Sequence, residues 1–288
     1  VDSTDDSGLR YNESKESTSP DAVVFNSKLY IGWTEQGSGT AFSKVAIKNF
    51  DGSFADVTDD ISRGAEDNTY TPKLADFGSK LYVIWSENIS GNKIFVSSYD
   101  GISWTAIDST DDTGLNYNSS NSATNPDAVV YNSKLYVTWQ ESNQIRVKEW
   151  DGTNWAFVDG NGSTGLNFNT SKNAYNPRLA VYDSRLYATW YEVSSEPAAS
   201  PPLAVNSSDI QPMASAPPSN QIRVKVWNGG DEWSSVDGGG TTGINKSSEN
   251  DAENPFLVVY DSELYNVWQE ETSGSPPWQI RAARADEN

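Results

Sequence analysis

The chain contains no cysteine and no histidine among its 288 residues. Without these side chains it has no disulfide, no thiol nucleophile, no Cys/His zinc site and no Ser-His-Asp triad. A metal bound by this chain would therefore be a hard cation with oxygen ligands. Long apolar runs are also missing, so we expect no insertion into a membrane.

Positive charge is scarce as well. Lysine and arginine total 20 against 40 aspartates and glutamates, which gives a net charge of −20. A surface this acidic repels nucleic acids and anionic membranes, so neither is expected as a partner. Hydrophobic residues make up 36% of the chain and aromatic residues 12%, which is enough for a packed core.

One sequence pattern occurs five times: a proline, a short apolar run, a turn, and then Leu-Tyr-x-x-Trp-x-Glu. The successive prolines are 52, 54, 51 and 78 residues apart, and the last interval contains an insertion. A period of roughly 40–50 residues with several short strands per repeat is typical of β-propellers. We therefore predict an all-β, five-bladed β-propeller that forms one domain over residues 1–288. The five anchors are Pro20 to Glu35, Pro72 to Glu87, Pro126 to Glu141, Pro177 to Glu192 and Pro255 to Glu270.

Each repeat predicts four antiparallel strands, because apolar and β-branched runs alternate with turn residues such as Asp151-Gly152. The fifth repeat lacks its own outer strand, and Val1 to Asp6 matches the end of a fourth strand. We therefore predict that this N-terminal segment pairs with Gln279 to Arg284 and closes the ring, which removes two open edges. The predicted blades lie near residues 20–60, 72–111, 126–162, 177–240, and 255–288 plus 1–6.

The connections between blades are long and constant. In four of them the next anchor proline follows a glycine at a spacing of 12 residues, which predicts ordered loops. The insertion at 193–220, in blade four, is rich in proline, alanine and serine. It is either a mobile surface loop or an arm that binds a partner or mediates oligomerisation, and it should emerge on the same rim as the long loops.

The Trp-x-Glu pairs and the arginine of Gln-Ile-Arg are the first candidates for a site. In one interpretation tryptophan fills the wedge between blades, glutamate accepts hydrogen bonds from a neighbouring loop, and arginine pairs with glutamate. In the other, tryptophan stacks on a sugar while glutamate and arginine bind its polar groups. Only blades three to five have the full set, so the predicted ligand-binding residues are Trp139, Glu141, Arg146, Trp190, Glu192, Arg223, Trp268, Glu270 and Arg281.

The residue after each anchor proline changes from blade to blade: Asp21, Lys73, Asp127, Arg178 and Phe256. The first strand is innermost in a propeller, so these side chains should circle the axis. They either pair with one another between blades or belong to an active site that also includes Asp76. Basic neighbours should lower the pKa values of the aspartates, the wrong direction for a general acid, so we predict no catalytic residue.

Acidic turns supply candidate oxygen ligands for Ca²⁺, at Asp2, Asp5 and Asp6, at Asp56, Asp59 and Asp60, and at Asp108, Asp111 and Asp112. They lack the alternation of a dedicated calcium loop, and the equivalent turns of the other repeats lose the paired aspartates. Solvated turns are the preferred interpretation, so no cofactor is expected, with Ca²⁺ as the alternative.

The repeat Asn-Pro-x-Leu-Ala-Val-Tyr-x-x-x-Leu-Tyr-x-x-Trp-x-Glu, followed by Gln-Ile-Arg-Val-Lys and Trp-Asp-Gly-x-x-Trp, resembles the propeller repeats of exported bacterial surface proteins. Its layout is also similar to kelch-type and sialidase-like propellers and to propeller lectins. This resemblance covers the whole chain and implies an extracellular or cell-surface location. In those lectins the arginine precedes the glutamate, whereas here Glu141 precedes Arg146.

These observations predict a non-catalytic, exported binding or adhesion module. It would recognise glycans or surface proteins at repeated sites between blades, on the rim that carries the long loops and not in the central channel. Two other functions stay open, a structural module for surface assembly and a propeller glycosidase or lyase. The sequence specifies neither the ligand nor the oligomeric state.

Overall fold

The computed structural model describes residues 8–10, 15–36, 43–58, 61–64, 68–108, 112–160, 164–194, 220–230, 232–239, 243–247, 249–272 and 277–284. Every regular element in these ranges is a β-strand, and the strands form five antiparallel sheets. The prediction of an all-β protein with five blades is therefore confirmed. Among the same residues, no helix is long and apolar enough to cross a membrane.

Four sheets contain four strands in sequence order, and the fifth contains three. Blade one consists of β1 (Ser17–Phe25), β2 (Lys28–Gln36), β3 (Ser43–Phe50) and β4 (Phe54–Thr58). Blade two consists of β5 (Thr69–Phe77), β6 (Lys80–Asn88), β7 (Asn92–Tyr99) and β8 (Trp104–Ala106). Blade three consists of β9 (Ala123–Tyr131), β10 (Lys134–Glu141), β11 (Gln144–Trp150) and β12 (Trp155–Phe157). Blade four consists of β13 (Ala174–Tyr182), β14 (Arg185–Val193), β15 (Asn220–Gly229) and β16 (Glu232–Ser235), and blade five of β17 (Ala252–Tyr260), β18 (Glu263–Glu271) and β19 (Trp278–Arg284).

Each first strand is irregular at its anchor proline. Pairing with the second strand shifts there in all five blades, and proline, which has no N–H to donate, is tolerated at such a bulge on an edge strand. The residue before the proline has a positive φ in every blade, a strained conformation that costs on the order of 1–3 kcal/mol. These residues are Ser19, Thr71, Asn125, Asn176 and Asn254, with φ between 47° and 54°.

The long loops are clamped onto the preceding blade. Leu115, in the loop before blade three, donates its backbone N–H to the carbonyl oxygen of Ile94 in blade two at 2.8 Å, and both side chains are 0% exposed. The preceding Gly114 has φ +61°, and a Cβ on it would lie 2.4 Å from the same carbonyl oxygen, so only glycine fits. Leu166 on Ile145 and Ile244 on Ile222 repeat this arrangement at 2.9 Å and 3.1 Å, which confirms ordered loops at these three connections.

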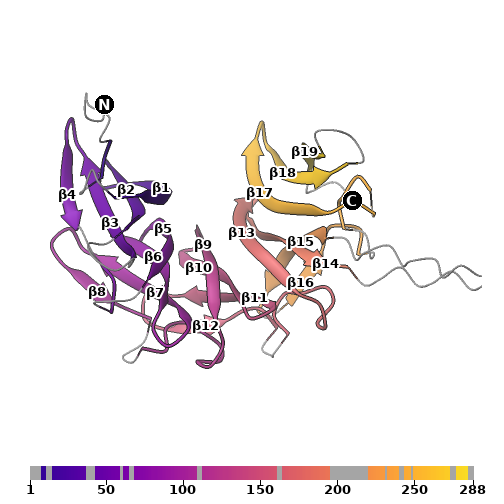
Figure 1. Cartoon of the computed structure of the whole chain (residues 1–288), viewed down its shortest axis with the longest axis horizontal. Coiled ribbons are helices and arrows are strands. Elements are labelled where there is room, and N and C mark those ends of the chain that lie inside the picture. The colour runs from indigo at the N-terminus through magenta and orange to yellow at the C-terminus, as the bar shows by residue number, and fades with distance from the viewer. Residues whose placement is uncertain are drawn as a thin grey trace, which may run out of the picture.

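The five blades follow one another around an arc whose ends, blade one and blade five, stand apart (Figure 1). Within the described residues β19 pairs only with β18. Val1 to Asp6 lies outside those residues, so closure of the ring by this segment stays a prediction. The insertion also lies largely outside the described residues, which do not include 195–219.

Candidate active site at the propeller axis

The Trp-x-Glu pairs lie inside the seams between blades. Trp139 Nε1 donates to Glu141 Oε2 at 3.0 Å, and the two carboxylate oxygens also accept the backbone N–H groups of Tyr117 and Asn118 at 2.7 and 2.8 Å. Glu87, Glu192 and Glu270 each bind a tryptophan and two consecutive loop N–H groups in the same way. The carboxylates thus fasten the long loops, as the structural interpretation of the sequence predicted.

The arginines of blades three and four pair with aspartate and not with glutamate. Arg146 Nε lies 2.7 Å from Asp159 Oδ2, and the Arg146 guanidinium lies 4.3 Å from the ring centroid of Tyr117. Arg223 lies 3.5 Å from Asp237 in the corresponding place. The predicted Arg–Glu pair is therefore wrong, because the fourth strand brings its terminal aspartate to the arginine while the loop occupies the glutamate.

Blade two contains the same contact between a guanidinium and an aromatic ring, but the arginine and the aromatic residue have exchanged positions. Phe95 stands where Arg146 stands in blade three, and Arg63 occupies the loop position of Tyr117, since its N–H binds Glu87. The Arg63 guanidinium lies 5.0 Å from the Phe95 ring centroid and pairs with Asp108. The repeat pattern shows that blade two lacks the arginine but does not reveal Arg63, because the loop that carries Arg63 departs from the regular spacing.

The predicted ligand-binding residues are thus mostly enclosed by the fold. Exposure is at most 3% for eight of them, namely Trp139, Glu141, Arg146, Trp190, Glu192, Arg223, Trp268 and Glu270. Only Arg281 is half-buried. A ligand cannot reach the eight buried side chains without parting two blades, so the structure gives them internal partners in place of a ligand.

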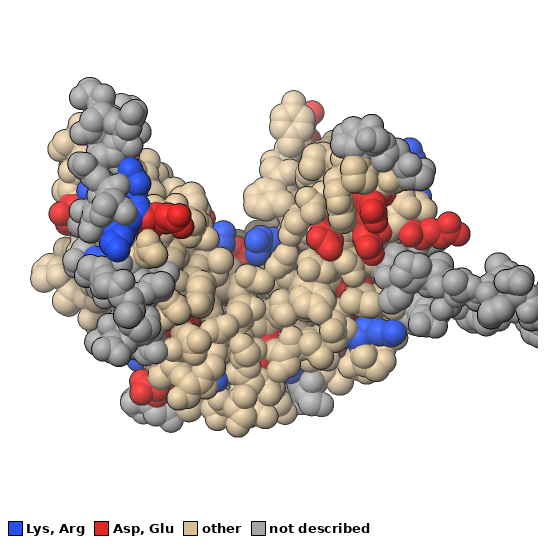
Figure 2. Space-filling model, viewed as in Figure 1, with Lys and Arg blue, Asp and Glu red and all other residues tan. Residues whose placement is uncertain are grey.

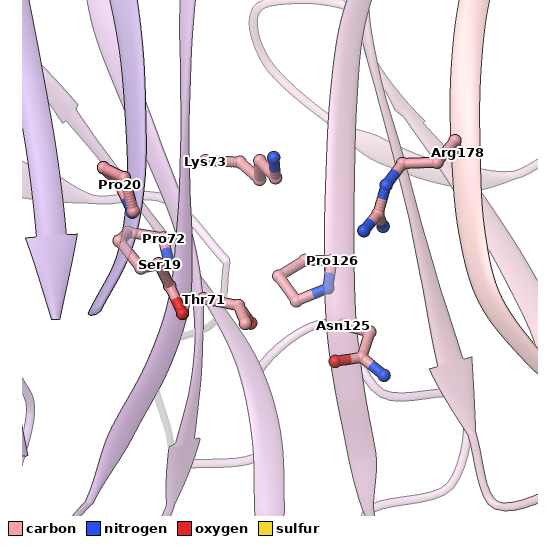
Figure 3. Close-up of a pocket in the computed structure, with 8 residues that line it drawn as sticks. All are labelled: Ser19, Pro20, Thr71, Pro72, Lys73, Asn125, Pro126 and Arg178. Carbon is pink, nitrogen blue, oxygen red and sulfur yellow. The ribbon is translucent and has the colours of Figure 1, made fainter. Parts of the chain in front are cut away.

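Apart from the seams, a cavity of about 210 Å³ opens at the axis of the propeller. Its walls come from the first strands of blades one to four and form three successive layers (Figure 3). Polar residues before the anchor prolines form one layer, the prolines the second, and charged residues after the prolines the third. The lining residues are Ser19, Pro20, Thr71, Pro72, Lys73, Asn125, Pro126 and Arg178.

Lys73 of the charged layer lies between two aspartates that are not themselves lining residues of the cavity. Its Nζ is 3.6 Å from Asp21 Oδ1 and 3.9 Å from Asp127 Oδ1. Each aspartate also accepts a backbone N–H from the next blade, Asp21 from Leu74 at 2.7 Å and Asp127 from Leu179 at 2.8 Å. The predicted ion pairing between blades is confirmed for these three residues.

The remaining axial candidates lie elsewhere. Phe256 is 56% exposed, and Asp76 is exposed near the end of β5, where no ion pair of the described residues joins it to Lys73. Asp76 is therefore not a member of this site.

The direction of the Asp127 pKa shift differs from the prediction. Its side chain is only 14% exposed, and burial raises the pKa of the Asp127 carboxyl against the opposing charges of Arg178 and Lys73. Desolvation outweighs the basic neighbours because the charged form loses most of its contact with water. The expected lowering is therefore wrong, and the shift is in the direction that suits a general acid.

The uncharged layer is a chain of hydrogen bonds across blades. Asn125 Nδ2 donates to Asn176 Oδ1, and Asn176 Nδ2 donates to Asn254 Oδ1, both at 2.8 Å. Thr71 Oγ1 is buried and has no hydrogen-bond partner among the described residues. This layer therefore presents hydroxyl and amide groups to whatever enters the cavity.

The acidic turns provide no metal site that the structure describes. No group of three or more potential metal ligands occurs in the described ranges. Asp108 pairs with Arg63, and Asp56 lies 3.4 Å from Lys48. Asp2, Asp5, Asp6, Asp59, Asp60 and Asp111 lie outside the described residues, so the Ca²⁺ alternative stays untested.

No family model matches the sequence, and no curated protein matches it. Solved structures match over nearly the full length. An exo-1,5-alpha-L-arabinanase from a bovine ruminal metagenomic library has a TM-score of 0.50 and 12% identity, with 93% of this chain and 92% of that chain covered. A GH43 endo-arabinanase from Bacillus licheniformis (TM-score 0.44, 12% identity, 92% of each chain) and an endo-arabinase from Bacteroides thetaiotaomicron (0.47, 10%, 92% and 93%) are also similar.

At this identity the likeness shows the fold alone, a five-bladed propeller. It supports the propeller resemblance but not a kelch-type or lectin family. It also corrects the predicted function. The seam residues expected to bind a glycan are buried, and the matched structure with a TM-score of 0.50 is an arabinanase, so a non-catalytic module with repeated sites between blades is no longer the preferred interpretation.

Proposed function

We propose that this chain is a propeller glycoside hydrolase whose active site is the axial cavity. The observation that carries this proposal is the pair of aspartates, Asp21 and Asp127, which come from different blades and approach Lys73 of the cavity wall from either side. Glycoside hydrolysis needs two carboxyl groups that flank the scissile bond. An extracellular polysaccharide as substrate agrees with the expected extracellular or cell-surface location.

The spacing of the carboxylates suits this chemistry. Both lie within 4 Å of the same Nζ, so their facing oxygens are separated by at most about 7–8 Å. Inverting enzymes use roughly 6.5–9.5 Å, which leaves room for a water molecule, and retaining enzymes use about 5–5.5 Å. The upper limit admits both geometries, and the stereochemistry of the product distinguishes them.

The environments of the two aspartates assign their roles. Asp127 is the general acid, because burial raises its pKa and a proton donor must keep its proton until the glycosidic oxygen takes it. Asp21 is the second carboxylate, which is the base that activates water in an inverting reaction and the nucleophile in a retaining one. Its side chain is more exposed, at 25%, and Lys73 supplies a countercharge 3.6 Å away. Lys73 also fixes both carboxylates relative to one another.

Release of reducing sugar from a panel of polysaccharides tests the proposal, beginning with arabinan because the similar structures are named as arabinanases. We expect Asp127→Asn and Asp21→Asn each to lower the rate by roughly 100-fold or more. Asp76→Asn is the matched control, since Asp76 is an exposed aspartate on the first strand of blade two and forms no ion pair with Lys73 among the described residues. Turnover that survives Asp127→Asn in a folded variant, or no turnover on any glycan, would overturn the proposal.

A further inference from the structure

Two cations face the axial cavity. Lys73 on β5 and Arg178 on β13 extend toward the same space from opposite sides (Figure 3). Lysine or arginine side chains are also visible at the bottom of the hollow between the two ends of the arc, beside acidic and uncharged ones (Figure 2). On a chain with a net charge of −20, basic groups gathered in a cavity are unusual and point to an anionic occupant.

The two cations differ in how they are neutralised. Lys73 is shared by Asp21 and Asp127. Arg178 donates from Nη1 to the carbonyl oxygen of Pro177 at 2.7 Å. Asp127 is its electrostatic neighbour, but no carboxylate of the described residues lies within 4 Å of its guanidinium. A guanidinium has five N–H donors in a planar fork that matches a carboxylate. Arg178 therefore has donors left for a carboxylate that enters the cavity.

The opposite side of the cavity suits the rest of a sugar. Ser19, Thr71 and Asn125 bring hydroxyl and amide groups, and Thr71 Oγ1 is buried with no hydrogen-bond partner in the described part of the chain. A buried hydroxyl without a partner is costly unless a ligand satisfies it. Between the two polar layers, Pro20, Pro72 and Pro126 offer apolar ring surface. At about 210 Å³ the cavity is smaller than the roughly 300–1,000 Å³ of pockets for drug-sized ligands, so its occupant is small.

From this arrangement we infer that the axial cavity binds a uronic acid residue of a glycan, with the sugar carboxylate on Arg178 and the hydroxyl groups toward Thr71 and Asn125. The inference rests on the proposed function in that the bound sugar is part of the substrate. A singly charged carboxylate fits better than a doubly charged phosphate, because Asp21 and Asp127 stand in the same layer as Arg178.

Binding of small probes to the whole chain tests this inference without turnover. The probes are D-galacturonate and D-glucuronate, their neutral parents D-galactose and D-glucose, and acetate, which has the charge without the ring. Titration by calorimetry or ligand-observed NMR should show both uronates binding about 10-fold or more tightly than the neutral sugars and than acetate. Equal binding of uronates and neutral sugars would overturn the inference.

Variants identify the residue responsible. Arg178→Gln should abolish the preference for uronates, and Arg178→Lys should restore only part of it because the fork is lost. Arg185→Gln is the matched control, an exposed arginine at the start of β14 on the same blade. Melting curves verify that each variant is folded. If Arg178→Gln is unfolded, the uronate preference of Arg178→Lys is the test. Full uronate preference in a folded Arg178→Lys or Arg178→Gln variant would assign the anion elsewhere and refute the site.

The two proposals fail in different ways. Release of sugar from neutral glycans that depends on Asp127, with no preference for uronates, removes the inference and leaves the hydrolase. Uronate binding that depends on Arg178, with no release from any glycan, removes the hydrolase and leaves an anion-binding cavity.

Discussion

The seam between blades three and four and the gap between blades five and one are built from the same repeat positions but have opposite environments. In the interior seam, Ile145 is 0% exposed beneath Leu166, which is 1% exposed. At the gap the equivalent residue of blade five, Ile280, is 73% exposed, and no backbone hydrogen bond of the described residues joins it to Leu9. The comparison shows that the neighbouring blade, and not the strand itself, buries these positions.

The two sides of the gap are complementary. A cavity of about 220 Å³ on blade one is lined by Leu9, Arg10, Ser17, Thr18, Pro20, Ile31 and Trp33. The equivalent positions of blade three, among them Leu115 and Trp139, cover the Ile84, Ile94 and Val96 side chains of blade two. Blade five has Val267, Ile280 and Ala282 at the corresponding positions. Since burial of exposed apolar surface favours association, we expect blade five to enter this cavity when the ring closes.

Alanine substitutions of the loop glycines should give the largest difference in stability between the interior seam and the gap. Gly165 has φ +57°, and a Cβ on it would lie 2.2 Å from the carbonyl oxygen of Ile145, whereas a Cβ on Gly8, at φ +65°, meets nothing within 4 Å. Gly165→Ala should therefore lower the free energy of unfolding by about 4 kcal/mol, from backbone strain and overpacking together. If the ring closes, Gly8→Ala should cost nearly as much in chemical denaturation. A cost of only about 1 kcal/mol, the strain alone, would show that the ends stay apart.

Truncation of the paired isoleucines should have the next largest effect. Ile145→Ala removes a fully buried side chain and should cost about 2–4 kcal/mol. Ile280→Ala should cost a similar amount if Leu9 covers Ile280 in a closed ring. If Ile280 stays 73% exposed, its replacement should change stability by less than about 0.5 kcal/mol, and this result would contradict closure.

The interior seams also contain buried aspartates whose titration should be measurable. Burial raises the pKa of Asp159 from its ordinary 3.8 to about 6, against the charge of Arg146, and raises that of Asp108 to about 6 against the charge of Arg63. The folded state therefore holds these protons more tightly than the unfolded state. This contribution to stability is fully present below about pH 4 and is lost as the pH rises through 6.

Asp159→Asn should remove about 2–3 kcal/mol of the change in unfolding free energy between pH 4 and pH 6. Denaturation at a series of pH values measures this slope, which is independent of the stability lost with the Arg146 ion pair. Asp108→Asn should remove a similar part, since Asp108 has the same raised pKa. Unchanged slopes in both variants would mean that these carboxyls are hydrated in the folded protein.

Removal of a tyrosine hydroxyl should give the smallest difference in stability between an interior seam and the gap. The Tyr182 hydroxyl donates to the carbonyl oxygen of Ser262 at 2.7 Å and so links blades four and five. Tyr182→Phe should cost about 1 kcal/mol. Tyr260 occupies the same position in blade five and is 72% exposed. In a closed ring it would reach the carbonyl of Ser27, so Tyr260→Phe should cost about as much, and no cost would indicate an open end.

Five blades and the inner position of the anchor prolines followed from the sequence alone. The period of the apolar residues and the missing N–H of proline are properties of each strand's own residues, so they can be recognised in the sequence without knowledge of the neighbouring blades. Alternation of Asp21, Lys73 and Asp127 likewise predicted ion pairing between blades, because equivalent positions of successive repeats must face one another.

Only the tertiary structure decided which partners the buried groups take. Arg146 pairs with Asp159 and not with Glu141, and Arg63, on the loop before blade two, replaces the arginine that β7 lacks, because the partners depend on which loop enters each seam. It also decided the direction of the Asp127 pKa shift, since the sequence shows the basic neighbours but not the loss of water that outweighs them. Desolvation is a property of packed surfaces, and no single repeat contains both surfaces of a seam.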